Sequence, residues 1–172
     1  MRKETPIYFG TTGPTPLGPL WVAVSNRGLI AVEFCSTQEE MAQRLQRRGF
    51  KQFILDPNRT AIAVRQICEY LQGELRSFDL PLDWSGMTAF QEQVLRLTCA
   101  IPYGRVATYA EIAGQVGRPR AARAVGRAEA TNPMPLVIPC HRVIGTDGKL
   151  HGYGGRGGLS TKAWLLKLER GA

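Results

Sequence analysis

Two short apolar runs rich in β-branched residues mark the beginning of the chain as sheet-forming. They are residues 20–25 (LWVAVS) and 29–34 (LIAVEF), and Asn26-Arg27-Gly28 lies between them. Apolar runs of this length around a short turn with Asn and Gly are typical of a β-hairpin. The pattern therefore predicts two antiparallel strands near the start of the chain.

Helical periodicity follows the predicted hairpin. Residues 37–48 place Gln38 and Glu39 at the start and arginines at the end, as a helix dipole favours. Residues 58–75 have apolar side chains at helical spacing, at Ile62, Val64, Ile67, Cys68 and Leu71. Residues 78–84 (FDLPLDW) alternate as a strand does, although Pro81 interrupts them. Strands mixed with helices predict a small α/β or α+β domain over residues 1–85, with a boundary at Ser85-Gly86.

The remaining residues, 86–172, are predicted to be mainly helical. Residues 88–100 have the helical period, and Thr108 to Glu111 form a T-x-x-E capping box that opens a second helix ending at Gly117. Pro119 suits the first turn of a third helix (PRAARAVGRAEA). Ser160 is expected to cap a last helix (TKAWLLKLE) that turns its apolar side chains toward a core.

A helix, a glycine turn and an Arg/Ala-rich helix in succession form a helix-turn-helix pattern. Helices joined in this way also occur in proteins that never bind DNA. The basic face of the second helix favours DNA; its arginines are Arg118, Arg120, Arg123 and Arg127. The helix has Ala121, Ala122, Ala124 and Ala128 but no Asn or Gln to pair with adenine, so we expect binding without base reading. Arg123 lies between alanine pairs and is placed to project alone into a duplex.

Charge strengthens the interpretation of the second half as a nucleic-acid binder. The 172-residue chain has a formal net charge of +8. Residues 1–85 carry 10 Lys and Arg against 9 Asp and Glu, whereas residues 86–172 carry 12 against 5. A neutral half followed by a basic half indicates that the second half meets a polyanion, although solubility alone would also explain the charge.

Composition and cysteine spacing bound the class of protein. The chain is 44% hydrophobic and 21% charged, as soluble globular proteins are. It has no apolar run long enough for a signal peptide or a membrane span, so a cytoplasmic protein is expected. The cysteines, Cys35, Cys68, Cys99 and Cys140, lie far apart, and only two histidines accompany them, so no metal site is expected. The first three are expected to be buried apolar side chains.

The segment VIPCHRVIG brings a thiol, an imidazole and a guanidinium together inside an apolar, strand-like run. A nucleophilic Cys140 needs a base or a positive field, and His141 and Arg142 supply both types. Neighbours on a strand point to opposite faces, so Pro139 must introduce a turn, or a water must bridge, for His141 to help Cys140. The alternative is a buried structural cysteine beside a satisfied histidine.

Two more polar residues are candidates for this site. Glu169 is a candidate to orient His141, as a third group does in nucleophile–base systems, although alone it would be read as a surface helix residue. Asn132, in the segment NPMP, is either a turn former or a link between the preceding helix and the Cys140 loop.

These motifs together resemble one family. PCHRVIG, the preceding Asn-Pro pair, the upstream AARAVG helix and the downstream GYGG loop are similar to the O6-alkylguanine-DNA alkyltransferases of the stand-alone type. The similarity runs from about Phe90 to Glu169, and TPLGPLWVAVSNRGL resembles the family's N-terminal hairpin more weakly. The resemblance implies a ribonuclease-H-like α/β domain and then a winged-helix-like DNA-binding domain.

The resemblance also implies a reaction. Cys140 would attack the alkyl carbon on guanine O6 in an SN2 transfer, and His141, through a water and oriented by Glu169, would make the thiolate. The product would be a stable thioether, so the protein would be a single-turnover reagent. The base must leave the duplex to react, because its reacting atom lies inside the helix.

Other residues receive roles from the same resemblance. Tyr109 would donate a hydrogen bond to the base and help protonate the leaving guanine. Arg123 would fill the space left by the flipped nucleotide, and Asn132 would be a hinge between helix and active-site loop. Further DNA contacts are expected from Arg120, Ala121, Ala122 and Arg127, and the base pocket from Pro135, Val143, Tyr153 and Gly154.

The implied partner is double-stranded DNA carrying O6-alkylguanine, with O4-alkylthymine as a second substrate. No cofactor is implied, and a monomer is expected, with cooperative assembly on DNA left open. Glu129 departs from the family, which usually has a neutral residue there. The loop GYGGRGGL also departs, since relatives have GYGGGL or YSGGL and Arg156 is among the additional residues. The alternatives are a non-catalytic alkyltransferase-like binder of damaged DNA and a cysteine hydrolase.

Overall fold

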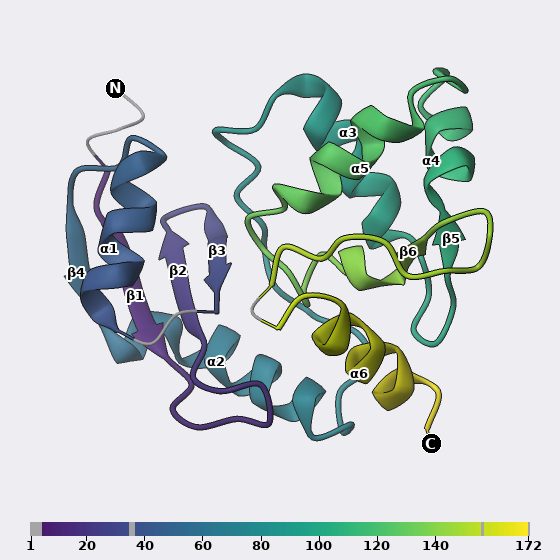
Figure 1. Ribbon diagram of the computed structural model, residues 1–172. Coiled ribbons are helices and arrows are strands. Elements are labelled where there is room, and N and C mark those ends of the chain that lie inside the picture. Colours follow the sequence, from purple (N-terminus) through teal and green to yellow (C-terminus); the bar gives the residue numbers. More distant parts are fainter. Residues whose placement is uncertain (1–4, 35–36, 156, 172) are drawn as a thin grey trace. The chain divides into compact units, whose positions relative to one another are not determined.

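The computed structural model describes residues 5–34, 37–155 and 157–171. It divides the chain into two compact units, Met1–Gly86 and Met87–Ala172. The first contains a four-stranded sheet with helices, and the second is mainly helical (Figure 1). The predicted fold class, an α/β domain followed by a helical domain with a helix-turn-helix, is confirmed.

The sheet of the first unit has the strand order β3-β2-β1-β4. Its strands are β1 (Ile7–Thr11), β2 (Trp21–Ser25), β3 (Gly28–Glu33) and β4 (Phe53–Leu55). Strands β2 and β3 pair antiparallel, which confirms the predicted hairpin. Strand β1 pairs antiparallel with β2 and parallel with β4.

Helices cover the two faces of this sheet. Helix α1 (Gln38–Arg47) begins after the N-cap Thr37, and helix α2 (Pro57–Leu71) begins after Asp56. Phe9 shares a buried cluster with Met41 and Leu45 of α1. Neighbouring strand residues point to opposite faces, and a β-carbon at Gly10 would collide with the side chain of Thr60 on α2. The missing side chain at Gly10 therefore allows α2 to lie close to the sheet.

Several sequence predictions for this unit were wrong in detail. The pattern did not predict β1 or the three-residue β4. Ile62, assigned to the apolar side of α2, is 58% exposed. The helix ends at Leu71 instead of near residue 75, because the chain turns at Gly73, which has a φ of 79°. Residues 78–84 contribute only an isolated bridge between Leu82 and Leu29.

Four α-helices organise the second unit: α3 (Ala89–Cys99), α4 (Tyr109–Gln115), α5 (Ala122–Ala130) and α6 (Leu159–Glu169). The predicted capping box opens α4: Thr108 Oγ1 accepts from the Glu111 N–H at 3.1 Å, and the Glu111 carboxylate accepts from the Thr108 N–H at 2.6 Å. A shared apolar cluster holds α3, α4 and α5 together. Helices α4 and α5, joined by a turn at Gly117, are the helix-turn-helix.

The segment around Cys140 differs from the predicted strand. Cys140–Arg142 form one turn of 3-10 helix, η1, and only β6 (Val143–Ile144) is extended, pairing in parallel with β5 (Ala107–Thr108). Pro139 precedes this turn with φ −81° and ψ 63°. Its ring fixes φ near this value, so it interrupts the strand.

Other local predictions also need correction. Pro119 lies in a turn before α5, closed by a hydrogen bond from the Ala121 N–H to the Arg118 carbonyl at 2.8 Å. Ser160 lies inside α6, whose N-cap is Gly158. Cys68 is half-buried and Cys99 is exposed, so neither is a core side chain. Cys35 and Arg156 lie outside the described residues.

The helices described here are all too short or too polar to cross a membrane.

Candidate functional site

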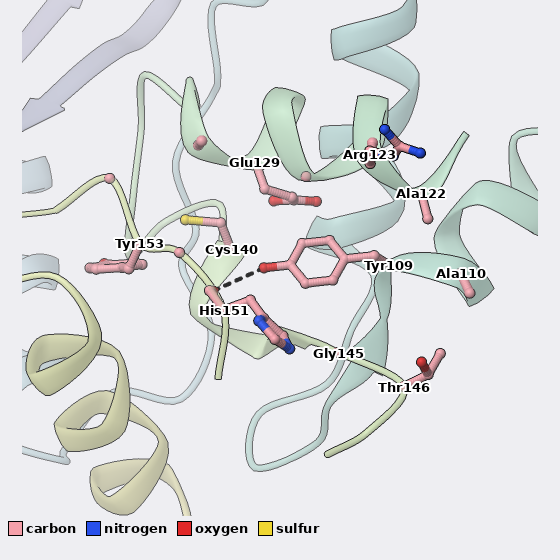
Figure 2. A pocket seen from close by; sticks show the side chains of 14 residues that line it. Tyr109, Ala110, Ala122, Arg123, Glu129, Cys140, Gly145, Thr146, His151 and Tyr153 are labelled. Atoms are coloured by element: carbon pink, nitrogen blue, oxygen red, sulfur yellow. Dashed lines mark hydrogen bonds between the residues drawn. The ribbon is translucent and has the colours of Figure 1, made fainter. Parts of the chain in front are cut away.

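A cavity of about 460 Å³ lies in the second unit, between α4, α5, η1 and the loop before α6. Its walls include Tyr109, Arg123, Glu129 and Cys140, together with residues 151–154. Figure 2 shows the Cys140 side chain on one wall, with Tyr109 extending across the pocket toward His151. Cavities of this size accommodate small organic groups such as a nucleobase.

The 3-10 turn η1 separates three consecutive functional side chains. A 3-10 helix has three residues per turn, so successive side chains point in three directions. Cys140 lines the cavity and is 5% exposed, whereas His141 is fully buried. Arg142, the third member, also points away from the cavity. The turn at Pro139 thus removes the simple alternation of a strand and lets each side chain have its own surroundings.

Glu169, near the end of α6, gathers the polar groups behind η1. One carboxylate oxygen lies 2.8 Å from His141 Nε2, and Arg142 donates to the same carboxylate through Nε and Nη2. The Gly104 N–H donates to its other oxygen at 3.0 Å. Burial lowers the pKa of His141, while the carboxylate opposes this shift. Glu169 is therefore a buried residue that holds the imidazole, and not a surface residue of the helix.

Asn132 joins the end of α5 to the segment before Cys140. Its Nδ2 donates to the Ile138 carbonyl at 2.9 Å, and its Oδ1 accepts from the Met134 N–H at 2.9 Å. Between these contacts Leu136 has a φ of 73°, in the region that non-glycine residues rarely adopt. The Ile138 N–H, bonded to the Met134 carbonyl at 2.8 Å, closes the turn. These hydrogen bonds and the burial of Leu136 hold a strained turn directly before the thiol.

The surroundings of Cys140 keep it a neutral thiol. Burial raises the pKa of Cys140 to about 12, and the nearby Glu129 carboxyl acts in the same direction. A hydrogen bond with Asn132 and the charge of Lys162 lower this pKa only in part. The positive charge that acts on the thiol is thus that of Lys162, since Arg142 is bound by Glu169 and by the Ile101 carbonyl at 2.6 Å.

Lys162 is fully buried and ties together the loop that closes the cavity. Its Nζ donates to the carbonyls of Val143 at 2.6 Å and His151 at 2.9 Å. Tyr109 Oη also donates to the His151 carbonyl, at 3.1 Å. Burial raises the pKa of Tyr109 to about 12, so its hydroxyl keeps its proton and stays a hydrogen-bond donor.

Tyr153 and Gly154 line the cavity from the loop before α6. Desolvation raises the pKa of the buried Tyr153 hydroxyl, which therefore keeps its proton. A β-carbon at Gly154 would lie 2.7 Å from the Ala130 carbonyl oxygen. Glycine thus lets the loop backbone pass directly against the end of α5.

The remaining predicted residues lie near the cavity, and most of them are not in its lining. Arg120, Arg123 and Arg127 are exposed, and Ala121 and Ala122 are half-buried at the start of α5. Of these, only Ala122 and Arg123 reach the cavity. Two residues predicted for the base pocket are buried outside the lining, Pro135 and Val143. Val143 belongs to the apolar cluster under the helices.

Both units match the domains of a known protein family. Residues 7–84 match the model of the "6-O-methylguanine DNA methyltransferase, ribonuclease-like domain", and residues 89–171 match that of the "6-O-methylguanine DNA methyltransferase, DNA binding domain". The chain belongs to the 6-O-methylguanine DNA methyltransferase family. This confirms the resemblance found in the sequence, including its weaker part in the first unit.

Relatives of this methyltransferase-family member agree over nearly the whole chain. A methylated-DNA–protein-cysteine methyltransferase of Methanosarcina barkeri is 44% identical over 155 residues, which is 90% of this chain and 92% of the relative. The crystal structure of Mycobacterium tuberculosis OGT in complex with DNA superposes with a TM-score of 0.81 at 39% identity, covering 95% of this chain and 93% of that chain. The O6-methylguanine-DNA methyltransferase of Pyrococcus kodakaraensis, at 24% identity and a TM-score of 0.61, shares the fold.

Sequence reasoning missed two residues of this methyltransferase site. Lys162 was not singled out, although it lies on the same side of α6 as the buried Leu165, Leu166 and Glu169, where a lone lysine signals a buried partner. Leu136 gave no signal, because a positive φ at a non-glycine residue cannot be read from its side chain. In the described part of the chain, no group of three His, Cys, Asp or Glu is arranged to hold a metal ion.

Proposed function

We propose that this protein repairs O6-alkylguanine in double-stranded DNA by moving the alkyl group irreversibly to Cys140. The observation that carries the proposal is the position of this thiol. Cys140 lies on the wall of a base-sized cavity that adjoins the basic helix of the helix-turn-helix, in a chain of the methyltransferase family.

In the proposed reaction, the Cys140 sulfur forms a bond with the alkyl carbon, and the bond from that carbon to O6 breaks. The thiol proton passes to His141 through a bridging water, with Glu169 holding the imidazole at 2.8 Å. Guanine leaves and takes up a proton, for which the Tyr109 hydroxyl is the proposed donor. Attack at a saturated carbon forms no tetrahedral intermediate, and the electron pair of the broken bond goes to the leaving guanine. The thioether that forms has no route back to a thiol.

In this proposal the damaged nucleotide leaves the duplex to reach the cavity, which is supported by the burial of Cys140 at 5% exposure. Flipping a base costs a few kcal/mol, which phosphate contacts and an inserted side chain offset. We assign the inserted side chain to Arg123, which is exposed and borders the cavity. The half-buried Ala121 and Ala122 allow the backbone of α5 to come close to DNA, and Arg120 and Arg127 supply phosphate contacts.

The pocket residues receive roles by the same argument. Tyr153 and Gly154 line the cavity and would contact the base, and the Val143 backbone and Pro135 would support it. Asn132 would keep α5 and the Cys140 turn in register through its two hydrogen bonds. O4-alkylthymine, which presents an alkyl group on a similarly placed oxygen, is the proposed second substrate.

The test is the mass of the intact protein after mixing with duplex DNA that contains one O6-methylguanine. We expect a gain of one CH2 group per protein molecule, on the peptide that contains Cys140, and no gain for Cys140→Ala. Binding to the damaged duplex without a mass change would replace the proposal by a non-catalytic binder. Repeated turnover without a modified cysteine would indicate a hydrolase.

A further inference from the structure

Glu129 is a buried carboxyl in the wall of the Cys140 cavity. It lies on α5, is 5% exposed, and stands above the Tyr109 ring and beside Cys140 in Figure 2. Its Oε1 lies 2.5 Å from the Thr98 hydroxyl on α3. Within the described part of the chain, its Oε2 has no hydrogen-bond partner.

The contact with Thr98 indicates which form of the carboxyl the fold accommodates. The Thr98 hydroxyl oxygen also lies 3.0 Å from the Val94 carbonyl. A hydroxyl has one proton to donate, so it cannot donate to both oxygens at once. A protonated Glu129 donates to Thr98 while Thr98 donates to Val94, and both contacts are then satisfied.

Desolvation acts in the same direction as this hydrogen-bond geometry. Burial raises the pKa of Glu129 to about 8, and the charge of Lys162 lowers it only in part. The titratable and charged groups that surround it come from every neighbouring element; they are Cys99 on α3, Tyr109 on α4, Arg123 on α5, Cys140 on η1, His151 in the loop and Lys162 on α6. Near neutral pH the cavity therefore contains an uncharged acid whose ionisation would add a negative charge beside the thiol.

We propose that Glu129 is a specificity-determining residue that sets which charge an alkyl group can have when it reaches Cys140. With the carboxyl protonated, the cavity accepts both neutral and anionic groups. Once the carboxyl ionises, the cavity still accepts neutral groups but rejects anionic ones. Two negative charges in a cavity with low-dielectric walls repel strongly, and the repulsion does not require direct contact.

The inference extends to the lesions that the protein would repair. Resting on the proposed function, it assigns O6-methyl and other uncharged adducts as the preferred substrates. It makes O6-carboxymethylguanine a substrate that is lost as the pH rises. No relative with a neutral side chain at this position would show that pH dependence.

The first experiment needs no DNA and uses the intact protein. Iodoacetamide and iodoacetate both alkylate a thiolate and release iodide, but only iodoacetate is an anion. The ratio of their rates at Cys140, measured by mass spectrometry of its peptide, cancels the thiolate fraction. We expect this ratio of neutral to anionic reagent to rise on the order of tenfold across the Glu129 pKa of about 8.

Two variants and one internal control test whether the charge of Glu129 causes the change in the rate ratio with pH. Glu129→Gln and Glu129→Met are both neutral, and either should give a ratio that does not change with pH. Cys68, which is half-buried in the other unit, should give a constant ratio in the same samples. A constant ratio at Cys140 in the unmodified protein overturns the proposal, and so does a rise that persists in the variants, which would assign the pH dependence to a group other than Glu129.

The second experiment compares duplexes with O6-methylguanine and O6-carboxymethylguanine across the same pH range. In the unmodified protein, the ratio of the O6-methylguanine rate to the O6-carboxymethylguanine rate should rise with pH, as the ratio for the two reagents does. In Glu129→Gln this ratio should not change with pH. Reaction with the reagents but with neither duplex would contradict the proposed function and leave the charge selection by Glu129 standing. Reaction with both duplexes at a pH-independent ratio would overturn the role of Glu129 while supporting repair.

Discussion

At the scale of single residues, the buried ionisable side chains Glu169, Lys162 and Glu129 of the second unit have different numbers of partners. Glu169 receives hydrogen bonds from His141, Arg142 and Gly104, so its negative charge is stabilised. Lys162 donates to two carbonyls within 2.9 Å. Among the described residues, Glu129 contacts the Thr98 hydroxyl, and its Oε2 has no hydrogen-bond partner. Buried charges are stable when they are paired and hydrogen-bonded, so Glu129 is the residue whose protonation should respond to pH.

This difference predicts how protein stability depends on pH. The ordinary pKa of Glu129 is 4.5 and burial raises it to about 8, so the folded state binds more protons between these values. Its contribution to stability is fully present below pH 4.5 and is lost as pH rises through 8. Glu129→Gln should therefore gain stability relative to the unmodified protein as pH increases, by about 1 kcal/mol per pH unit. Chemical denaturation between pH 4.5 and 8 measures the difference in the free energy of unfolding between the two proteins. A difference that stays constant with pH would contradict this prediction.

At the scale of elements, helix α5 combines three tasks along its nine residues. Its exposed side carries Arg123, its buried side places Glu129 in the cavity, and Asn132 follows its end. A helical period of 3.6 residues separates these side chains in direction while the rigid backbone fixes their spacing. The exposed Arg123 and the cavity wall therefore move as one body.

The exposed position of Arg123 on α5 leads to a prediction about the extruded base. Arg123→Ala should slow reaction with O6-methylguanine in duplex DNA by about tenfold or more, since the vacancy in the base stack is then unfilled. Reaction with free O6-benzylguanine should change much less, because no base is extruded. The rates of Cys140 alkylation by the two substrates test this prediction. The matched control is Arg127→Ala, which removes another exposed arginine from the same helix. Equal losses on both substrates would contradict an inserted side chain.

How far the sequence predicts these elements depends on whether the signal is local. The capping box at Thr108 and Glu111 predicted the start of α4 correctly, because its hydrogen bonds span four consecutive residues. The turn at Pro139 was one of two alternatives, beside a bridging water, by which His141 could help Cys140, and the structure has a turn there. Strand β4 was missed because three residues show no clear period, and its pairing with β1 joins segments far apart in the chain.

At the scale of the whole molecule, the uneven charge distribution should determine how the protein binds DNA. Residues 86–172 carry 12 basic against 5 acidic residues, and the exposed arginines of α5 are among them. Lys and Arg that neutralise phosphates release counterions, so binding weakens as salt increases.

The affinity for undamaged duplex DNA, measured at several salt concentrations, tests this dependence of binding on salt. Arg120→Gln should lower the slope of log affinity against log salt by about one, the value expected for one lost phosphate contact. Arg65→Gln removes an arginine with a 67% exposed side chain from the first unit and should leave the slope unchanged. Equal effects of the two substitutions would indicate that the net charge alone drives binding.

The site as a whole was only partly predictable from the sequence. Cys140, His141 and Glu169 were identified because their residue types suit the chemistry and because the motif is specific. Other features of the site arise only when α3, α5 and α6 pack around η1. They are the burial of Lys162, the backbone strain at Leu136 and the contact of Glu129 with Thr98. Such packing depends on contacts distant in sequence, which no local pattern encodes.

The burial of Cys140 also bears on oxidation. Peroxides react with the thiolate form of cysteine, and with a pKa of about 12 the resting thiol contains very little of it. A cysteine used only once would be lost if sulfenic acid formed before a damaged base arrived. Burial in the cavity should therefore slow the reaction of Cys140 with peroxides.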